Sequence, residues 1–501
     1  MLRHWLPLLL LSIAVAAALG ALLLWQAPAL FSSPLPTVAP LEEGDQEIAL
    51  LLPATNAADW ERFLQALWHV KETQPLEIDA ANAFPDATAA VPEIAWRVED
   101  SRSWLRLRWY KLASATDLDY WVQRLARRKP APLAVIGGDN SNRAEAIARA
   151  LQMHCGQLPA PPRFLITTAT ADRVAQHNLM EIYPGKTFRF CFTNEQMAKA
   201  IADFLWSRPE LHLLPDSGPV YLLGWMDNSY SLDLAERFRQ SLPRLPLAPV
   251  IDDRPNRDPY WYRTIPHSIG TFGRPNADER RVAGELLDEL DRRPEQRQAL
   301  LVLPANSWPA RRMLHALARS APTMTGRFLV VNGDAIDFNT VYRDGNLTWP
   351  VQDLPFQLVF FCHRNPIDRK AGFRAGTAGD VVVQDLTATT EADTGTYDLL
   401  LYADIAAAVT AAAFQNGQLL ADAGAVDRNL RKTRFASTGN RLDGSGEHVV
   451  YLHPERVGDR VLPKAWLRVY GRTSSGWELQ PPELRVTYGA TPTPGEKENA
   501  P

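Results

Sequence analysis

Cysteine is scarce in this sequence, and no metal or redox motif is built from it. The three cysteines, Cys155, Cys191 and Cys362, lie far apart and form no C-x-x-C unit. Neither a zinc site nor a disulfide framework is therefore indicated. We predict three buried apolar side chains, which is the usual state of free cysteine. A single disulfide formed after export stays an alternative.

Catalytic motifs and an excess of basic charge are also missing. The sequence contains no G-x-S-x-G, H-E-x-x-H, G-x-x-x-x-G-K-[ST] or G-x-G-x-x-G pattern, so an enzyme is disfavoured and no cofactor or metal is predicted. Gly444-Ser445-Gly446 lacks the strand-to-helix setting of a nucleophile elbow and is better explained as a hairpin turn. The net charge is -4, from 53 Lys and Arg against 57 Asp and Glu. No basic field is left to hold nucleic acid.

The amino terminus carries one long apolar run. From Trp5 to Trp25 there is no charged residue, and about 20 apolar residues let a helix cross a bilayer. Arg3 precedes the run and the next charge is Glu42, so the remainder is expected outside the cytoplasm. We predict a membrane anchor at residues 5–25, within a segment 1–25. Cleavage of that segment as a signal peptide, which would release a secreted protein, stays an alternative.

Two segments at the ends of the chain are expected to lack a fold of their own. Residues 26–45 are rich in proline and suit a spacer between membrane and folded body. Residues 489–501 have the composition of a disordered tail. Everything between them is predicted to be folded.

That folded region alternates short apolar runs with helical patterns. Seven runs have the length and composition of buried strands: 47–54, 133–137, 163–167, 220–224, 299–303, 327–331 and 357–361. Helical spacing of apolar residues occurs at 60–67, 144–151 and 197–205. Such alternation predicts parallel sheets covered by helices on both faces, because parallel strands need crossover connections. The number of strands predicts two sheets in an α/β fold.

The last part of the chain has a different pattern. Residues 441–457 and 466–480 are typical of β-hairpins, with Asp443-Gly444 and Ser475-Gly476 as turn signals.

Two polar segments follow predicted strands, at the sheet edge where parallel sheets bind ligands. After residues 133–137, Asn140 and Ser141 open a helix whose free N–H groups favour an anion. After residues 163–167, Thr168 and Thr170 offer hydroxyl groups beside backbone amides. Simple helix capping by these residues stays an equal alternative.

The sequence resembles the type I periplasmic binding proteins, in particular the branch that binds leucine, isoleucine and valine. The likeness runs through most of residues 46–487. It rests on VIGGDNSNRAEAIA, ITTATADRV, YPGKTFRFCFTNEQMAKAIADFL, GPVYLLGWMDNSYSLDLAERF, TYDLLLYADIAAAVTAAA and RLDGSGEHVVYL with VYGRTSSGWEL, whose order and spacing agree. The resemblance implies two Rossmann-like lobes joined by a multi-strand hinge. Residues 46–187 and 362–435 would form lobe 1, and residues 188–361 and 436–488 would form lobe 2.

The resemblance also implies a ligand site between the lobes. Ser141, Thr170 and the backbone of Ala169 match positions that grip a ligand's carboxylate and ammonium groups. Tyr230 matches an aromatic that covers the ligand, and Asp334 matches an acidic partner for the ammonium. Further cleft positions are Asn140, Thr168, Ser307, Trp308 and Tyr397. Asp334 as a turn aspartate, and Tyr230 and Trp308 as packed aromatics, stay alternatives.

The function implied is capture of a small polar solute outside the cytoplasmic membrane of a bacterium, for an ABC permease. A membrane-tethered sensor that acts through a partner protein is the alternative. Asp139 departs from the family pattern, because a carboxylate there repels an anionic ligand unless Arg143 pairs with it. An amide, a peptide-like molecule or a more cationic solute therefore stays open beside a plain amino acid. Residues 251–280 look longer than in the family.

Overall fold

The structure is a computed structural model. It describes residues 38–85, 90–113, 115–175, 177–211, 220–242, 260–268, 274–292, 298–320, 327–335, 356–363, 380–382, 399–432, 447–457 and 460–487. The predicted anchor at 5–25, most of the spacer and the predicted tail at 489–501 lie outside these ranges. Among the helices within them, none combines the length and the apolar character needed to span a membrane.

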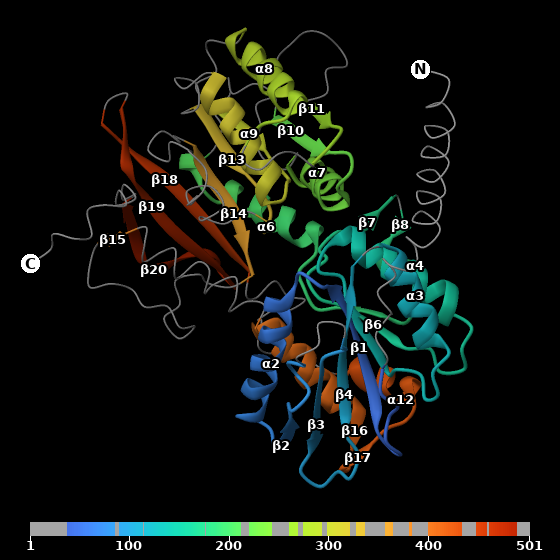
Figure 1. Cartoon of the computed structure of the whole chain (residues 1–501). Helices are drawn as coiled ribbons and strands as arrows, with labels where there is room; N and C mark the ends of the chain where they lie inside the picture. The colour runs from blue at the N-terminus through green and yellow to red at the C-terminus, as the bar shows by residue number, and fades with distance from the viewer. Residues whose placement is uncertain are drawn as a thin grey trace, which may run out of the picture.

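Seven strands form the first sheet, in the order β2-β3-β4-β1-β5-β6-β9 (Figure 1). Their bounds are β1 Gln46–Pro53, β2 Leu76–Asp79, β3 Glu93–Val98, β4 Leu105–Leu112, β5 Ala134–Gly137, β6 Arg163–Ile166 and β9 Thr187–Arg189. Strands β4, β1, β5, β6 and β9 run parallel, whereas β2, β3 and β4 pair antiparallel. The carboxyl ends of β1, β5 and β6 consequently lie at one edge of the sheet.

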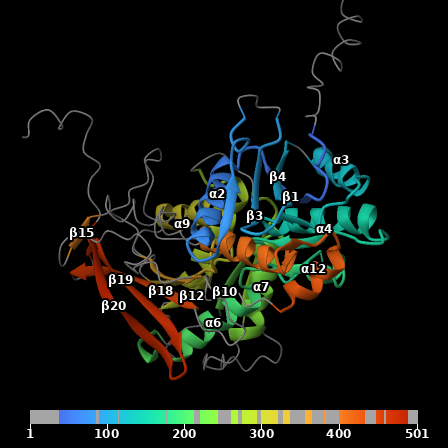
Figure 2. The same cartoon turned by 90° about the horizontal axis from the view of Figure 1, so that it is seen from below.

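Helices cover both faces of this sheet. Alternate side chains of a strand point to opposite faces. Thus Ile48, Leu50 and Leu52 of β1 pack with α2 (Ala57–Lys71), with helical residues 399–413 and with α12 (Ala423–Leu430). Ala49 and Leu51 pack instead with α3 (Ala115–Ala126) and α4 (Ser141–Cys155). Figure 2 shows α12, late in the chain, among the early elements of this lobe.

Nine strands form the second sheet, in the order β11-β10-β12-β13-β14-β18-β19-β20-β15. Their bounds are β10 Val220–Trp225, β11 Tyr260–Ile265, β12 Ala299–Val302, β13 Phe328–Val331, β14 Gln357–Cys362, β15 Asp380–Val382, β18 His448–Val457, β19 Arg460–Thr473 and β20 Gly476–Thr487. The run from β11 to β14 is parallel. From β14 through β20 the pairing is antiparallel, and these last strands extend away from the helices (Figure 1).

The second sheet is also covered on both faces where it is parallel. Leu300 and Val302 of β12 pack with α6 (Asn194–Trp206) and α7 (Ser229–Ser241). Ala299 and Leu301 pack with α8 (Ala277–Asp291) and α9 (Ser307–Ser320). Each lobe therefore has a sheet between two helical layers, as the alternating pattern predicts.

The chain passes from the first lobe to the second within three residues. Phe190 packs in a core cluster of the first lobe, and Phe192 packs in a core cluster of the second. Cys191 lies between them and is buried. The segments that join β15 to residue 399 and residue 432 to residue 447 lie outside the described ranges.

The seven predicted buried strands correspond to β1, β5, β6, β10, β12, β13 and β14. The predicted parallel sheets are present but mixed, because β2–β4 and β14–β20 add antiparallel pairs. The turn predicted at Ser475-Gly476 joins β19 to β20, with Gly476 at φ 126°. Gly444 lies outside the described residues. Strand β15 pairs with β20 in the second sheet, although the resemblance assigns 362–435 to lobe 1. With only three residues, β15 is too short to show an alternating apolar pattern in the sequence.

None of the three cysteines forms a disulfide. Cys155 and Cys191 are buried as predicted, whereas Cys362 is partly exposed. Burial raises the pKa of the Cys155 and Cys191 thiols to about 12, so both stay protonated and unreactive near neutral pH.

Candidate functional site

The amino end of α4 follows directly from the carboxyl end of β5. Gly138 makes this tight turn with φ 79°, and a Cβ there would lie 2.9 Å from Cβ of Ala144. The Asn140 side chain caps the helix by accepting the N–H of Arg143 at 2.9 Å. Helix capping, the alternative role of Asn140, is therefore present. Arg143 also pairs with the Asp139 carboxylate, as its spacing in the sequence suggested.

The loop after β6 lies against this helix end. The Ser141 hydroxyl oxygen accepts the N–H of Ala171 at 3.3 Å, and the Thr168 hydroxyl donates to the Asp139 carbonyl at 3.0 Å. Thr170 is 2% exposed, and within the described residues its hydroxyl has no hydrogen-bond partner. Ala169 is fully buried, and its carbonyl accepts a hydrogen bond from the Cys191 thiol.

The facing side comes from α7 and the end of β13. The Tyr230 hydroxyl donates to Asp334 Oδ1 at 3.0 Å, and His363 Nε2 lies 2.7 Å from Asp334 Oδ2. Burial and the Asp334 carboxylate raise the pKa of Tyr230, so its hydroxyl stays protonated and donates. Gly333 makes this packing possible, since a Cβ there would lie 2.6 Å from the Tyr230 hydroxyl.

Side chains of both lobes line one cavity of about 370 Å³. The lining residues are Asp139, Asn140, Ser141, Asn142, Thr168, Thr170, Asp227, Asn228, Tyr230, Ser268, Asn306, Asp334 and Ala335. Six predicted residues are thus brought together: Asn140, Ser141, Thr168, Thr170, Tyr230 and Asp334. We call this space the cleft cavity.

The lobes touch each other at this cavity. Asn142 Nδ2 donates to the Asp227 carbonyl at 3.2 Å, and Asn142 Oδ1 accepts the N–H of Ser229 at 3.1 Å. One side chain of the first lobe thereby bonds the backbone at the start of α7 in both directions. This pair of bonds exists only when the lobes are close.

Three predicted residues are not among those lining the cleft cavity, and a fourth cannot be placed. The Ser307 hydroxyl donates to the Ala335 carbonyl at 2.8 Å. Trp308 is 41% exposed, with the Arg311 guanidinium 5.3 Å from its ring centroid. Ala169 is buried behind the loop. Tyr397 lies outside the described residues.

Sequence reasoning missed several cavity residues. Asp227 and Asn228 come two and three residues after β10, and Asn306 comes four residues after β12. The rule that polar residues after strands bind ligands was therefore enough to find them. Ser268 follows β11, a strand that the sequence did not reveal. His363 follows β14 and contacts Asp334 without itself lining the cavity.

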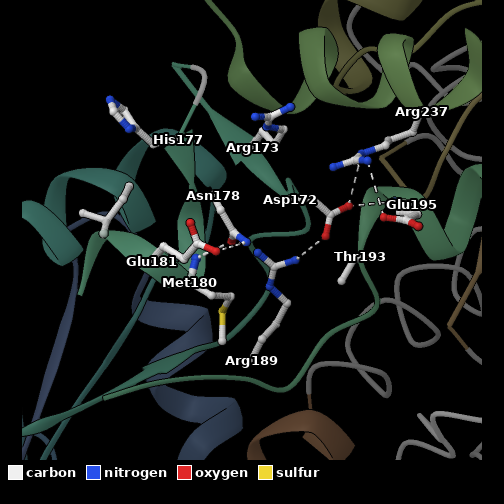
Figure 3. Close-up of a pocket in the computed structure, with 11 residues that line it drawn as sticks. Asp172, Arg173, His177, Asn178, Met180, Glu181, Arg189, Thr193, Glu195 and Arg237 are labelled. Atoms are coloured by element: carbon white, nitrogen blue, oxygen red, sulfur yellow. Dashed lines mark hydrogen bonds and ion pairs between the residues drawn. The ribbon is translucent and has the colours of Figure 1, made fainter. Parts of the chain in front are cut away.

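A second, larger cavity of about 720 Å³ lies next to the lobe crossing (Figure 3). Its lining comes from the hairpin β7 (Arg173–Val174) and β8 (His177–Asn178), from the short α5 (Leu179–Ile182), and from the start of α6. Arg189 and Arg237 flank Asp172, at 3.3 Å and 3.6 Å from its carboxylate oxygens. The Asp172 carboxylate in this cavity is therefore paired with two arginines of the protein itself.

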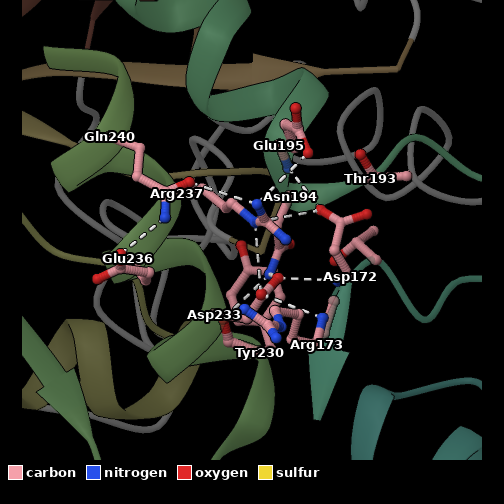
Figure 4. A network of polar contacts seen from close by, with 12 residues as sticks. Asp172, Arg173, Thr193, Asn194, Glu195, Tyr230, Asp233, Glu236, Arg237 and Gln240 are labelled. Carbon is pink, nitrogen blue, oxygen red and sulfur yellow. Dashed lines mark hydrogen bonds and ion pairs between the residues drawn. The ribbon is translucent and has the colours of Figure 1, made fainter. Parts of the chain in front are cut away.

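Asp233 of α7 joins the two lobes beside that cavity (Figure 4). Its carboxylate accepts the backbone N–H of Asp172 at 2.8 Å and that of Arg173 at 3.1 Å, both from the first lobe. It also accepts from Asn194 Nδ2 at 2.9 Å. Burial raises the pKa of Asp233, and the nearby Asp172 carboxylate raises it further. We call Asp172, Arg189, Asn194, Asp233 and Arg237 the crossing network.

The crossing network also holds the loop that bears Thr170. Arg189 Nη2 donates to the Ala171 carbonyl at 2.6 Å, and Arg189 Nη1 donates to the Thr170 carbonyl at 3.3 Å. The N–H of Asn194 donates to the same Thr170 carbonyl at 2.8 Å. The loop therefore has the cleft cavity on one side and the crossing network on the other.

Comparison with known proteins shows the fold. No protein-family model matches this chain, and no curated protein matches it. A solute-binding protein of an ABC transporter from R. palustris, in complex with 4-hydroxybenzoate, matches with a TM-score of 0.50 at 10% identity, over 88% of this chain and 96% of the other. An ABC transporter substrate-binding protein from Sphaerobacter thermophilus gives 0.49 at 14% identity, over 89% and 97%. A leucine-binding protein from Thermotoga maritima gives 0.48 at 14% identity, over 87% and 98%.

Proposed function

We propose that this chain, which has the two-lobed type I periplasmic binding protein fold, binds a small polar solute in the cleft cavity. The observation that carries the proposal is the cavity itself. It lies between the lobes, and all its described lining residues except Ala335 carry a hydroxyl, amide or carboxylate group, near the carboxyl ends of the parallel strands of the two sheets. Open α/β sheets bind ligands at that edge. An amino acid, an amide or a related compound is of the right size and polarity.

The two walls of the cavity have different roles in this proposal. On the first lobe, Ser141 already accepts one N–H, so its own hydroxyl hydrogen is available for an acceptor atom of the solute. Thr170 offers a second hydroxyl. On the second lobe, Asp334 accepts from an amino group, and Tyr230 orients Asp334 and covers the solute. Charge-assisted bonds to Asp334 would be about twice as strong as neutral ones.

Closure of the lobes would make binding tight. A solute that touches both walls stabilises the arrangement in which Asn142 bonds the start of α7. The solute shifts the population of open and closed forms by as much as its affinity for them differs. Asn142 would thereby add to affinity through closure of the lobes.

We further propose that binding takes place outside the cytoplasmic membrane and serves an ABC importer. The apolar run at 5–25, with Arg3 before it, supports an exported and anchored chain. The solute-binding protein from R. palustris, which shares the fold, belongs to an ABC transporter. The anchor itself stays a prediction from the sequence.

A thermal-shift screen of the full chain against amino acids, their amides and small peptides tests the proposal. A compound at 100 times its dissociation constant stabilises the folded state by about 2.7 kcal/mol. We expect at least one compound to raise the melting temperature. Ser141→Ala and Asp334→Ala should each reduce that shift, because each removes a group that touches the solute.

Two exposed positions away from the cavity provide matched controls. Ser320→Ala at the end of α9 and Asp288→Ala on α8 change the same residue types at exposed sites. Both should keep the full shift. The proposal is wrong if no compound shifts the melting temperature. The site assignment is wrong if the cavity variants respond as the controls do.

A further inference from the structure

The charge on the walls of the cleft cavity is one-sided. Three aspartates line it, and among its described lining residues none is Lys, Arg or His. Two of these aspartates have a basic neighbour: Asp139 pairs with Arg143, and Asp334 contacts His363.

Asp227 is the aspartate without such a neighbour. Among the described residues, both of its carboxylate oxygens receive only the backbone N–H of Ser268, at 2.8 Å and 2.9 Å. Within the described part of the chain it forms no ion pair. No cation among the described lining residues therefore offsets this carboxylate. The second-lobe wall of the cavity is therefore negative.

Thr170 gives independent evidence that a partner is missing from this cavity. Only 2% of this residue is exposed. It lines the cavity, and its hydroxyl bonds to none of the described residues. The solute would supply the acceptor that this hydroxyl needs.

We infer that the cleft selects a solute with net positive charge, whose acceptor group is a neutral carbonyl rather than a carboxylate. The amide of an amino acid has this chemistry. Its ammonium group meets the negative wall at Asp334 and Asp227, and its carbonyl oxygen accepts from Thr170 and Ser141. The inference rests on the proposed function and narrows its solute class.

A free carboxylate fits this cavity less well than an amide. It would find hydroxyl groups but no cation among the described lining residues, and it would face Asp227 across a space of about 370 Å³. Two like charges about 6 Å apart repel by about 0.7 kcal/mol in water and by more where the effective dielectric constant is lower. The amide keeps the acceptor and removes that repulsion.

Calorimetric titration of the full chain at low ionic strength tests the inference. The probes are matched triads: the amide, the free acid and the N-acetyl acid of glycine, alanine, serine, leucine, phenylalanine and glutamine. Within a triad the side chain is constant, and the net charge falls from +1 through 0 to -1. We expect the best amide to bind about tenfold tighter than its free acid, and the N-acetyl acid to bind weakest.

Asp227→Asn measures the contribution of the negative wall. It keeps the shape of the side chain and removes its charge, so the ratio of amide to acid affinity should fall about 3- to 10-fold. Asp288→Asn, an exposed aspartate on α8, should leave that ratio unchanged. A general structural effect of Asp227→Asn would weaken amide and acid equally and would not change the ratio.

The outcomes separate the inference from the proposed function. If a free acid or an N-acetyl acid binds as tightly as its amide, the inference is overturned and the proposed function stands. An unchanged ratio in Asp227→Asn also overturns it. If no member of any triad binds, both the inference and the proposed function are overturned.

Discussion

The two lobes meet in two polar regions that are built differently. In the crossing network, Asp233 receives three N–H groups, and Asp172 is held by Arg189 and by the N–H of Glu195 at 2.9 Å. In the cleft cavity, Thr170 makes no side-chain bond within the described residues, and Asp227 receives one backbone donor. The larger space, about 720 Å³, belongs to the region whose acidic groups are better satisfied.

This difference separates a structural region from a binding region. The crossing network contains three buried polar atoms without a hydrogen-bond partner among the described residues, Arg189 Nε, Asn194 Oδ1 and Arg237 Nε. Its carboxylates, however, are already bonded, and a ligand would have to break those bonds first. Groups left without partners in a cavity gain a bond when a ligand arrives. The crossing network is therefore expected to govern stability and the position of the loop, whereas the cleft cavity governs affinity. Each prediction below tests one side of this contrast.

Asp233→Ala should have the largest effect, and the effect should be on folding. It leaves the backbone N–H groups of Asp172 and Arg173 and the Asn194 amide without their acceptor. We expect the free energy of unfolding to fall by about 2–4 kcal/mol. Chemical denaturation without solute measures this. Asp288→Ala should change it by less than about 0.5 kcal/mol, and an equal loss in the two variants would show that the network is not structural.

Gly333→Ala should damage the cleft cavity, with a smaller cost in stability. Its Cβ would lie 2.6 Å from the Tyr230 hydroxyl and 2.8 Å from Leu234 Cδ2, so Tyr230 must move away from Asp334. Overpacking of this kind costs about 1–3 kcal/mol. We expect solute affinity to fall more than about tenfold, in line with the loss of a charge-assisted bond.

Gly284→Ala on α8 is the matched control, because a Cβ there would meet no atom within 4 Å. It should stabilise the protein by up to about 1 kcal/mol through better helix propensity and leave affinity unchanged. If Gly333→Ala binds the solute as the control does, Tyr230 and Asp334 do not form the solute site.

Much of the cleft cavity was predictable because its residues follow buried strands. Thr168 and Thr170 follow β6, and Asp334 follows β13 by three residues. The sequence shows these strands as unbroken apolar runs, and parallel strands bring their carboxyl ends to one edge. Neighbours in space could thus be inferred from segments far apart in the chain.

The strands that stayed hidden carry charge in their interior. In β4, Arg106 and Arg108 alternate with Leu105 and Leu107. Arg108 is nearly buried and pairs with Glu93, and its Nη1 lies 3.4 Å from the buried Glu47. The arginines in such a segment suggest exposure to solvent, so the sequence does not indicate a buried strand. Its ion pairs depend on three strands coming together, which no single segment reveals.

One missed element did have a local signal. Asn416 and Gly417, both with positive φ, form the turn between β16 (Phe414–Gln415) and β17 (Gln418–Leu419). Asn-Gly between apolar residues is the strongest short signal for a hairpin. Asp233 had no such signal. In the sequence it is a helical aspartate four residues before Arg237, and its role depends on a loop of the other lobe.

Asn142→Ala should weaken solute binding modestly and leave folding unchanged. It removes two hydrogen bonds that form across the cleft cavity only when the lobes are close. Each is worth about 0.5–1.5 kcal/mol and the pair about 1–3 kcal/mol, so we expect affinity to fall by at least about 5-fold. Calorimetry with the best solute measures this. Gln152→Ala, an exposed amide on the same helix, is the control. A loss of unfolding free energy without any loss of affinity would contradict the assignment of Asn142 to closure.

The smallest expected effect is the pH dependence that Asp233 gives to stability. Because burial raises the pKa of Asp233 in the folded state, the folded protein keeps a proton there at pH values where the unfolded chain has already lost it. The folded state then binds more protons than the unfolded state, so stability must fall as pH rises from the ordinary aspartate pKa, about 3.9, through the raised one.

Asp233→Asn cannot titrate, and it should lack this decline. Denaturation of both proteins from about pH 4 to about pH 7 should therefore show the wild type losing stability relative to the variant. The same comparison with Asp288→Asn should give a constant difference. If the wild type instead gains stability relative to Asp233→Asn as pH rises, the pKa of Asp233 is lowered in the folded state. The N–H groups that donate to this carboxylate would then affect its pKa more than burial does.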